Sequence, residues 1–73
     1  MYILKLTAIS SRDGKRRSAI LCSSGMEKEY SWQMKPEVIA RRAVTFKTLE
    51  DAKDFGKALH VSRGETLTAE YVS

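Results

Sequence analysis

The sequence predicts an α+β fold in which a mostly antiparallel sheet of four or five strands carries a single α-helix on one face. Three observations lead to this prediction. Apolar and polar residues alternate in several short stretches, Asp13-Gly14 marks a tight hairpin, and one stretch near residue 50 has helical spacing. The expected order is three strands, a short fourth strand, the helix and a last strand. The 73 residues, 1–73, are expected to form one small domain.

The helix is expected to begin after Thr48, because Asp51 stands three residues later, where the acid of a capping box belongs. Acidic residues in the first turn and Lys57 and His60 in the last turn complement the helix dipole. Helical spacing places five residues on one face: Leu49, Ala52, Phe55, Gly56 and Leu59. The glycine either lets the helix approach a sheet closely or is a tolerated weakness that costs about 1 kcal/mol.

The first two strands are expected at residues 2–10 and 18–24, joined at Asp13-Gly14. Two registers fit this hairpin. A two-residue loop pairs Leu6 with Leu21, whereas a three-residue loop that ends at Gly14 pairs Leu4 with Cys22. We favour the second register, because it gathers apolar residues on one face and makes Cys22 a small core residue.

Further along the chain, residues 24–28 are expected to form a turn and residues 29–34 a half-buried strand that ends before Pro36. Residues 37–42 could form one or two helical turns, or they could lead directly into a short strand expected at 43–46. We favour an irregular or short helical connection before that strand. A turn at 62–65 precedes the last strand, at 66–71. If the strands on either side of the helix belong to the same sheet, they would be parallel and form a right-handed unit.

Tyr30, Trp32 and Met34 share one side of the third strand. Facing the helix, they would belong to the core. On the sheet face that the single helix leaves bare, they would be a stacking platform for single-stranded nucleic acid or an anchor for a protein. We favour the core.

The residues that most enzymes and metal sites need are scarce. Cys22 and His60 are the only cysteine and histidine, which is too few for a disulfide or a structural zinc site. A nucleophilic pair of the two would require a strand residue and a helix-end residue to meet in a cleft. The four glycines are isolated, so no phosphate-binding loop is expected. We expect no catalytic residues, no metal and no cofactor, and the chain is predicted not to be an enzyme.

Charge is the sharpest functional signal. The net charge is +4, and positive residues concentrate around the hairpin tip and near residue 42. A basic hairpin suits a nucleic-acid groove or a nucleoprotein complex, because arginine donates paired hydrogen bonds to phosphates. The common alternative is a solvated turn that maintains solubility. The predicted binding residues are Arg12, Lys15, Arg16, Arg17, Arg41, Arg42 and Lys47.

The alternative function is a protein-binding inhibitor or adaptor of the phage or mobile-element type, which would cover a partner's acidic surface. No membrane segment or signal peptide is expected, and the free thiol suits the cytoplasm. Because so small a core supplies only about 3–5 kcal/mol of net stability, we expect either tight packing or a homodimer.

The stretch Phe46–Lys53, preceded by strands and a basic turn, resembles the end of the small arm-type DNA-binding domains of tyrosine recombinases. The resemblance implies a three-stranded sheet that enters a DNA groove. The further strand expected after the helix departs from that pattern, so the chain is not assigned to the family.

Overall fold

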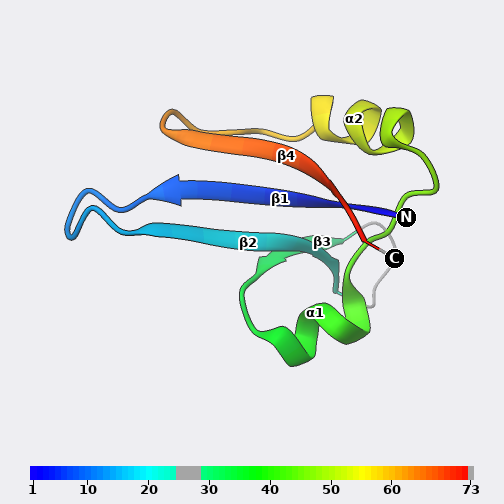
Figure 1. Cartoon of the computed structure of the whole chain (residues 1–73), viewed down its shortest axis with the longest axis horizontal. Helices are drawn as coiled ribbons and strands as arrows, with labels where there is room; N and C mark the ends of the chain where they lie inside the picture. Colours follow the sequence, from blue (N-terminus) through cyan, green and yellow to red (C-terminus); the bar gives the residue numbers. More distant parts are fainter. Residues whose placement is uncertain (25–28, 73) are drawn as a thin grey trace.

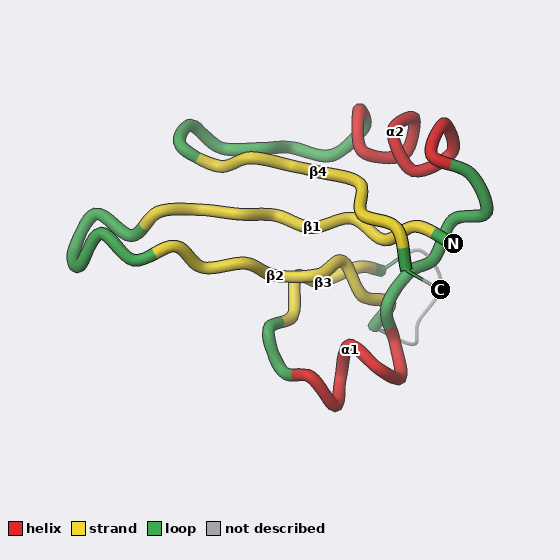
Figure 2. Tube along the Cα trace, viewed as in Figure 1, coloured by secondary structure: helices red, strands yellow, loops and turns green. Residues whose placement is uncertain are grey.

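A computed structural model describes residues 1–24 and 29–72, so the turn expected at 24–28 lies largely outside the described residues. The described chain forms a four-stranded sheet with two helices (Figures 1 and 2). The elements, in chain order, are β1 (Tyr2–Ile9), β2 (Arg16–Ser23), β3 (Tyr30–Gln33), α1 (Pro36–Arg42), α2 (Leu49–Lys57) and β4 (Glu65–Tyr71). The α+β class and the antiparallel sheet are therefore confirmed.

The strand order is β3-β2-β1-β4, and all three neighbouring pairs are antiparallel. The predicted parallel unit around α2 is wrong, because β4 lies beside β1. The chain leaves the sheet at Phe46, whose backbone bonds to Tyr2 at the start of β1. Helix α2 and the loop after it then carry the chain back toward the hairpin end, where Glu65 lies opposite Ala8. Because β1 ends near this point, a strand that starts here beside β1 is antiparallel to it.

The expected strand at 43–46 does not form. Instead this segment makes two isolated bridges, from Ala43 to Cys22 on β2 and from Phe46 to Tyr2 on β1. The amide of Val44 also donates to the carbonyl oxygen of Leu21 at 3.0 Å. The segment crosses from one strand to the other, so it follows neither strand long enough to extend the ladder.

The prediction of a single helix is also wrong, because residues 36–42 complete a second helix. Pro36 occupies the start of α1, Glu37 lies in its first turn, and Arg41 and Arg42 lie in its last turn, which matches the helix dipole. Helix α1 packs against β2, whereas α2 packs against β1 and β4. Cys22 of β2 is fully buried but lies outside the core cluster beneath α2, so α1 covers the other side of the sheet.

Helix α2 begins as predicted. Its N-cap is Thr48, whose hydroxyl accepts a hydrogen bond from the amide of Asp51 at 3.1 Å. Ala52 and Gly56 are its buried residues, whereas Leu49, which was predicted on the same face, is 38% exposed at the helix start. The glycine lies where the helix meets the sheet, because a Cβ atom built on it would be 3.0 Å from Cδ2 of Leu67 and 3.7 Å from Cδ2 of Leu4. Close approach of the helix is therefore its role.

Both predicted hairpin registers are wrong. Lys5 lies opposite Ile20, and the amide of Ser10 donates to the carbonyl oxygen of Lys15, which leaves a four-residue loop at 11–14. Gly14 closes this loop with a φ of 69°, a conformation that few other residues adopt without strain. The longer loop shifts the pairing by one residue, so by alternation Leu4 and Leu21 share a face and Cys22 points to the other face.

The main core lies between the sheet and α2. Leu4, Leu21 and Ala52 are its buried members, and Trp32, Phe46, Phe55 and Leu67 pack around them. Tyr30 also faces α2, since its ring makes an edge contact with Phe55 at 5.3 Å between centroids. Of the three residues in the aromatic stripe, only Trp32 packs against the buried core, as favoured, whereas Tyr30 is 45% and Met34 is 57% exposed. Cys22 is fully buried as expected, but on the side of β2 where α1 packs.

Candidate nucleic-acid interface

The most distinctive surface feature is the arm formed by the ends of β1 and β2 and their connecting loop, residues 9–17. It projects past the rest of the sheet (Figures 1 and 2). Strand β3 pairs with β2 only from Ile20 to Ser23, and β4 reaches no further along β1 than Ala8. The arm is therefore a two-stranded ribbon without a neighbour on either edge, and such a ribbon fits the major groove of a DNA duplex.

Every residue from Ser11 to Arg17 is exposed, and the arm carries four basic residues and one acid. Arg17 pairs with Asp13, with 3.2 Å between guanidinium nitrogen and carboxylate oxygen. Arg12, Lys15 and Arg16 form no ion pair with any residue in the described part of the chain. Three positive side chains are thus available to an anionic partner.

Asp13 organises the loop that presents these charges. Its carboxylate accepts a hydrogen bond from the amide of Lys15 at 2.9 Å, and this bond, assisted by Ser10 and Arg17, lowers the pKa of the Asp13 carboxyl below its usual value. The amide of Gly14 donates to the carbonyl oxygen of Ser10, also at 2.9 Å. These bonds hold a compact turn with its basic side chains on the outside.

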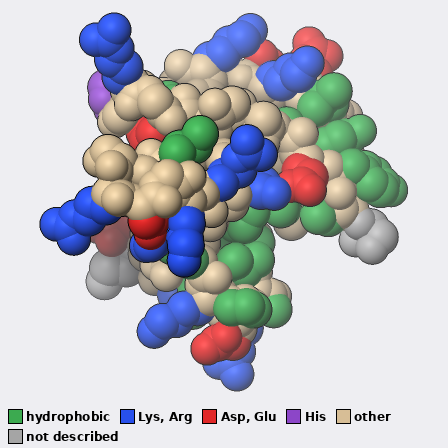
Figure 3. All heavy atoms as spheres, turned by 60° about the vertical axis from the view of Figure 1, so that its left-hand side comes forward, with side chains coloured by type: hydrophobic (Ala, Val, Ile, Leu, Met, Phe, Trp, Pro, Cys, Tyr) green, Lys and Arg blue, Asp and Glu red, His purple; other side chains and the backbone are tan. Residues whose placement is uncertain are grey.

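A hollow of about 320 Å³ lies at the base of the arm, lined by Thr7, Ile9, Arg16, Gly64 and Thr66. Two hydroxyls and a glycine backbone there stand near a guanidinium, and these are groups that bind phosphate oxygens. The exposed Arg63 precedes Gly64 in the chain. Figure 3 turns this end forward and shows Lys and Arg side chains projecting around it.

The structure brings four of the seven predicted residues together on the arm: Arg12, Lys15, Arg16 and Arg17. The other three lie toward the opposite end of the sheet. Arg41 and Arg42 precede Ala43, which bridges to Cys22, and Lys47 follows Phe46, which bridges to Tyr2. At about 3.3 Å per residue, the six residues from Arg16 to Cys22 alone separate the two groups by about 20 Å. Arg42 also donates to the carbonyl oxygen of Ser24 at 2.8 Å.

Arg63, Gly64, Thr7 and Thr66 were missed by sequence reasoning. A turn at 62–65 was expected, but its position beside the arm depends on β4 pairing with β1. The sequence held only a weak signal for this, namely the match in length and alternation between the first and last strands.

Cys22 and His60 do not form a nucleophilic pair. Cys22 is buried on the α1 side, and His60 is exposed beyond the end of α2. Burial also raises the pKa of the Cys22 thiol, which disfavours the thiolate. No group of three or more metal-ligating side chains occurs among residues 1–24 and 29–72. Neither helix in this part of the chain is long and apolar enough to cross a membrane.

Comparison of the chain with protein-family models, with curated proteins and with solved structures gave no match.

Proposed function

We propose that the protein is a non-enzymatic binding module whose basic arm binds nucleic acid through the phosphate backbone. The observation that carries the proposal is the projection of the arm, with three unpaired positive side chains on a ribbon of suitable width. Basic residues that serve only solubility can lie anywhere on the surface, so solubility alone does not explain an arm that extends past the sheet. Backbone binding of this kind is independent of base sequence and sensitive to salt.

The arm offers a small number of contacts, so moderate affinity is expected. Three phosphate contacts, from Arg12, Lys15 and Arg16, give a slope of about −2.7 for the logarithm of the binding constant against the logarithm of salt concentration on duplex DNA. Between 50 and 200 mM salt, the affinity should then fall about fortyfold. Fluorescence anisotropy with labelled duplex DNA, single-stranded DNA and RNA measures this slope directly.

The test uses two variants of equal charge. The double variant Arg12→Ala/Arg16→Ala removes two arm contacts, so the affinity at low salt should fall about tenfold on every sequence and the slope should flatten by about 1.8. The control, Arg41→Ala/Lys47→Ala, removes two exposed charges at the opposite end and should bind like the wild type. Equal losses in both variants would mean that net charge, and not the arm, is responsible.

Asp13→Asn gives an independent prediction of opposite sign. An asparagine oxygen can still accept the bond from the Lys15 amide, so the turn is kept while Arg17 loses its carboxylate partner. Binding should become about two to five times tighter, with a slope steeper by about 0.9. Unchanged binding by this variant would argue against phosphate contact by Arg17.

Absence of binding to any of the three nucleic acids at low salt contradicts the proposal. The adaptor hypothesis then predicts a defined protein partner whose capture survives nuclease treatment.

A further inference from the structure

We propose that the protein forms a two-fold symmetric homodimer in which β4 pairs with β4 of a second copy and the two α2 helices lie side by side. The dyad passes beside Thr68, perpendicular to the sheet, and joins the two sheets into one of eight strands. This inference uses the sheet edge remote from the arm's tip and does not rest on the proposed function.

The edge of β4 that faces away from β1 is open. Within residues 1–24 and 29–72, this seven-residue strand pairs with β1 alone, and it contains neither lysine nor proline, two residues that protect edges against pairing. The N-terminal nitrogen of Met1 donates to the carbonyl oxygen of Val72, and the amide of Val72 donates to the carbonyl oxygen of Met1. These two residues therefore form a hydrogen-bonded pair. By alternation, the backbone groups of Leu67, Ala69 and Tyr71 point away from β1, toward the free edge.

A dyad at Thr68 pairs the two central outward residues, Leu67 and Ala69, with each other. Leu67 comes opposite Ala69 of the partner subunit, so apolar side chains meet on the α2 face. On the other face, Thr66 comes opposite Glu70 of the partner subunit, which avoids a pair of like charges. The centre of β4 is therefore self-complementary in both backbone and side chains.

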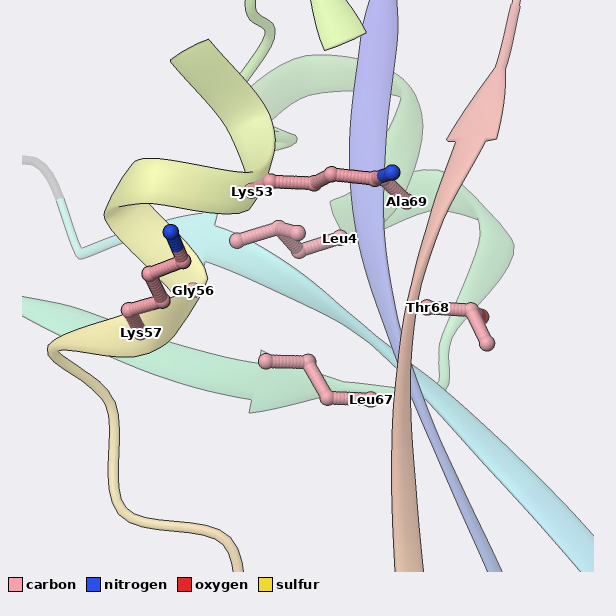
Figure 4. A pocket seen from close by; sticks show the side chains of 7 residues that line it. All are labelled: Leu4, Lys53, Gly56, Lys57, Leu67, Thr68 and Ala69. Atoms are coloured by element: carbon pink, nitrogen blue, oxygen red, sulfur yellow. The ribbon is translucent and has the colours of Figure 1, made fainter. Parts of the chain in front are cut away.

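A groove lies between α2 and β4. It has a volume of about 280 Å³, its apolar floor comes from Leu4, Gly56, Leu67 and Ala69, and Lys53 and Lys57 stand at its rim (Figure 4). Gly56 lies in the floor of this groove because the helix approaches Leu67 and Leu4 closely there. The groove adjoins the β4 edge, so an added strand would cover apolar surface as well as backbone groups.

The charges on α2 favour a second copy of this chain as the occupant. Glu50, Lys53, Asp54 and Lys57 share one helix face and line a common hollow on α2. Their charges alternate in sign along the helix. When the helix meets its own copy in the antiparallel direction, Glu50 faces Lys57 of the partner subunit and Lys53 faces Asp54 of the partner subunit. Asp54 and Lys57 already pair within the helix at 3.7 Å, and in the dimer Glu50 and Lys53 gain opposite neighbours as well.

The spacing of the elements permits this helix contact. Helix α2 contacts β1 and β4 equally, which places it above the gap between these strands, about one strand spacing of 4.8 Å from the dyad. The two helix axes would then be about 10 Å apart, within the range of packed helices.

The test exchanges charges at the centre of the helix contact. Lys53→Glu and Asp54→Lys each place like charges opposite one another twice, and neither lies at a helix end where the dipole would matter. Sedimentation equilibrium should give the wild type twice its 8.3 kDa mass. Each variant alone should self-associate at least tenfold more weakly, and an equimolar mixture should recover the dimer, because the exchanged charges are complementary. Circular dichroism checks that both variants remain folded.

A second variant tests the strand contact. Ala69→Pro removes an amide that points to the free edge, so it should abolish the dimer while β1 and β4 stay paired. A wild type that is monomeric at several hundred micromolar overturns the proposal. So does a dimer that persists in both charge variants, or a mixture that fails to recover association. A monomer that binds an added extended peptide along β4 would show that the edge serves a different partner.

Discussion

Gly56→Leu should lower the free energy of unfolding by about 2–3 kcal/mol, a large share of the roughly 3–5 kcal/mol that a domain of this size holds. A Cβ atom at this position already comes to 3.0 Å from Cδ2 of Leu67, so a longer side chain must push Leu67 and Leu4 aside or lift α2 from the sheet. Urea unfolding monitored by tryptophan fluorescence measures the loss, since Trp32 packs against the same core.

Two further substitutions separate overpacking from helix propensity. Gly56→Ala gains about 1 kcal/mol of propensity but has the tight contact with Leu67, so its stability should stay within about 1 kcal/mol of the wild type. Ala58→Leu introduces the same leucine at an exposed position near the helix end and should change stability by no more than about 0.5 kcal/mol. A neutral result for Gly56→Leu would contradict the packing of α2 described above.

Leu21→Ala should cost about 3 kcal/mol, because this side chain is only 2% exposed and lies within the core cluster between the sheet and α2. Truncation removes buried apolar surface and leaves a cavity that β2, bonded to strands on both sides, cannot close by moving. The matched control is Leu49→Ala, whose leucine is 38% exposed and should cost less than about 1 kcal/mol. Similar losses for the two variants would contradict the core assignment and the hairpin register beneath it.

The low stability of this small domain also limits how its binding can be tested. A core with few fully buried side chains leaves little stability to lose, so binding experiments on the arm must use variants that leave α2 and the sheet intact. The arm substitutions proposed above meet this condition, since the arm residues are exposed and lie outside the core cluster.

Local signals were enough for several elements. Thr48 and Asp51 identify the start of α2 because capping is a contact between residues three apart in the chain. Gly56 could be assigned to the sheet-facing side from helical spacing alone. The basic hairpin tip is likewise a local feature, since a tight loop keeps its own residues together in any fold that contains it.

Tertiary structure decided what depends on distant partners. The hairpin register differs from the favoured prediction because Asp13 and Gly14 close a four-residue loop. This shift of one residue places Cys22 on the sheet face opposite to that of Leu4. The position of β4 followed from the path of the chain around α2, which no spacing within the sequence records. That path brings Gly64 and Thr66 to the base of the arm and leaves Arg41 and Lys47 far from it.

The sequence by itself therefore determined the α+β class, the cap and buried face of α2, and a basic hairpin, because each depends on residues close together in the chain. Only the tertiary structure decided the packing of the second helix on β2, the antiparallel placement of β4, and which of the predicted basic residues lie together on the arm. Alternation within a strand shows which residues share a face, but it does not show which strand lies next to it, because backbone pairing is open to any strand of suitable length.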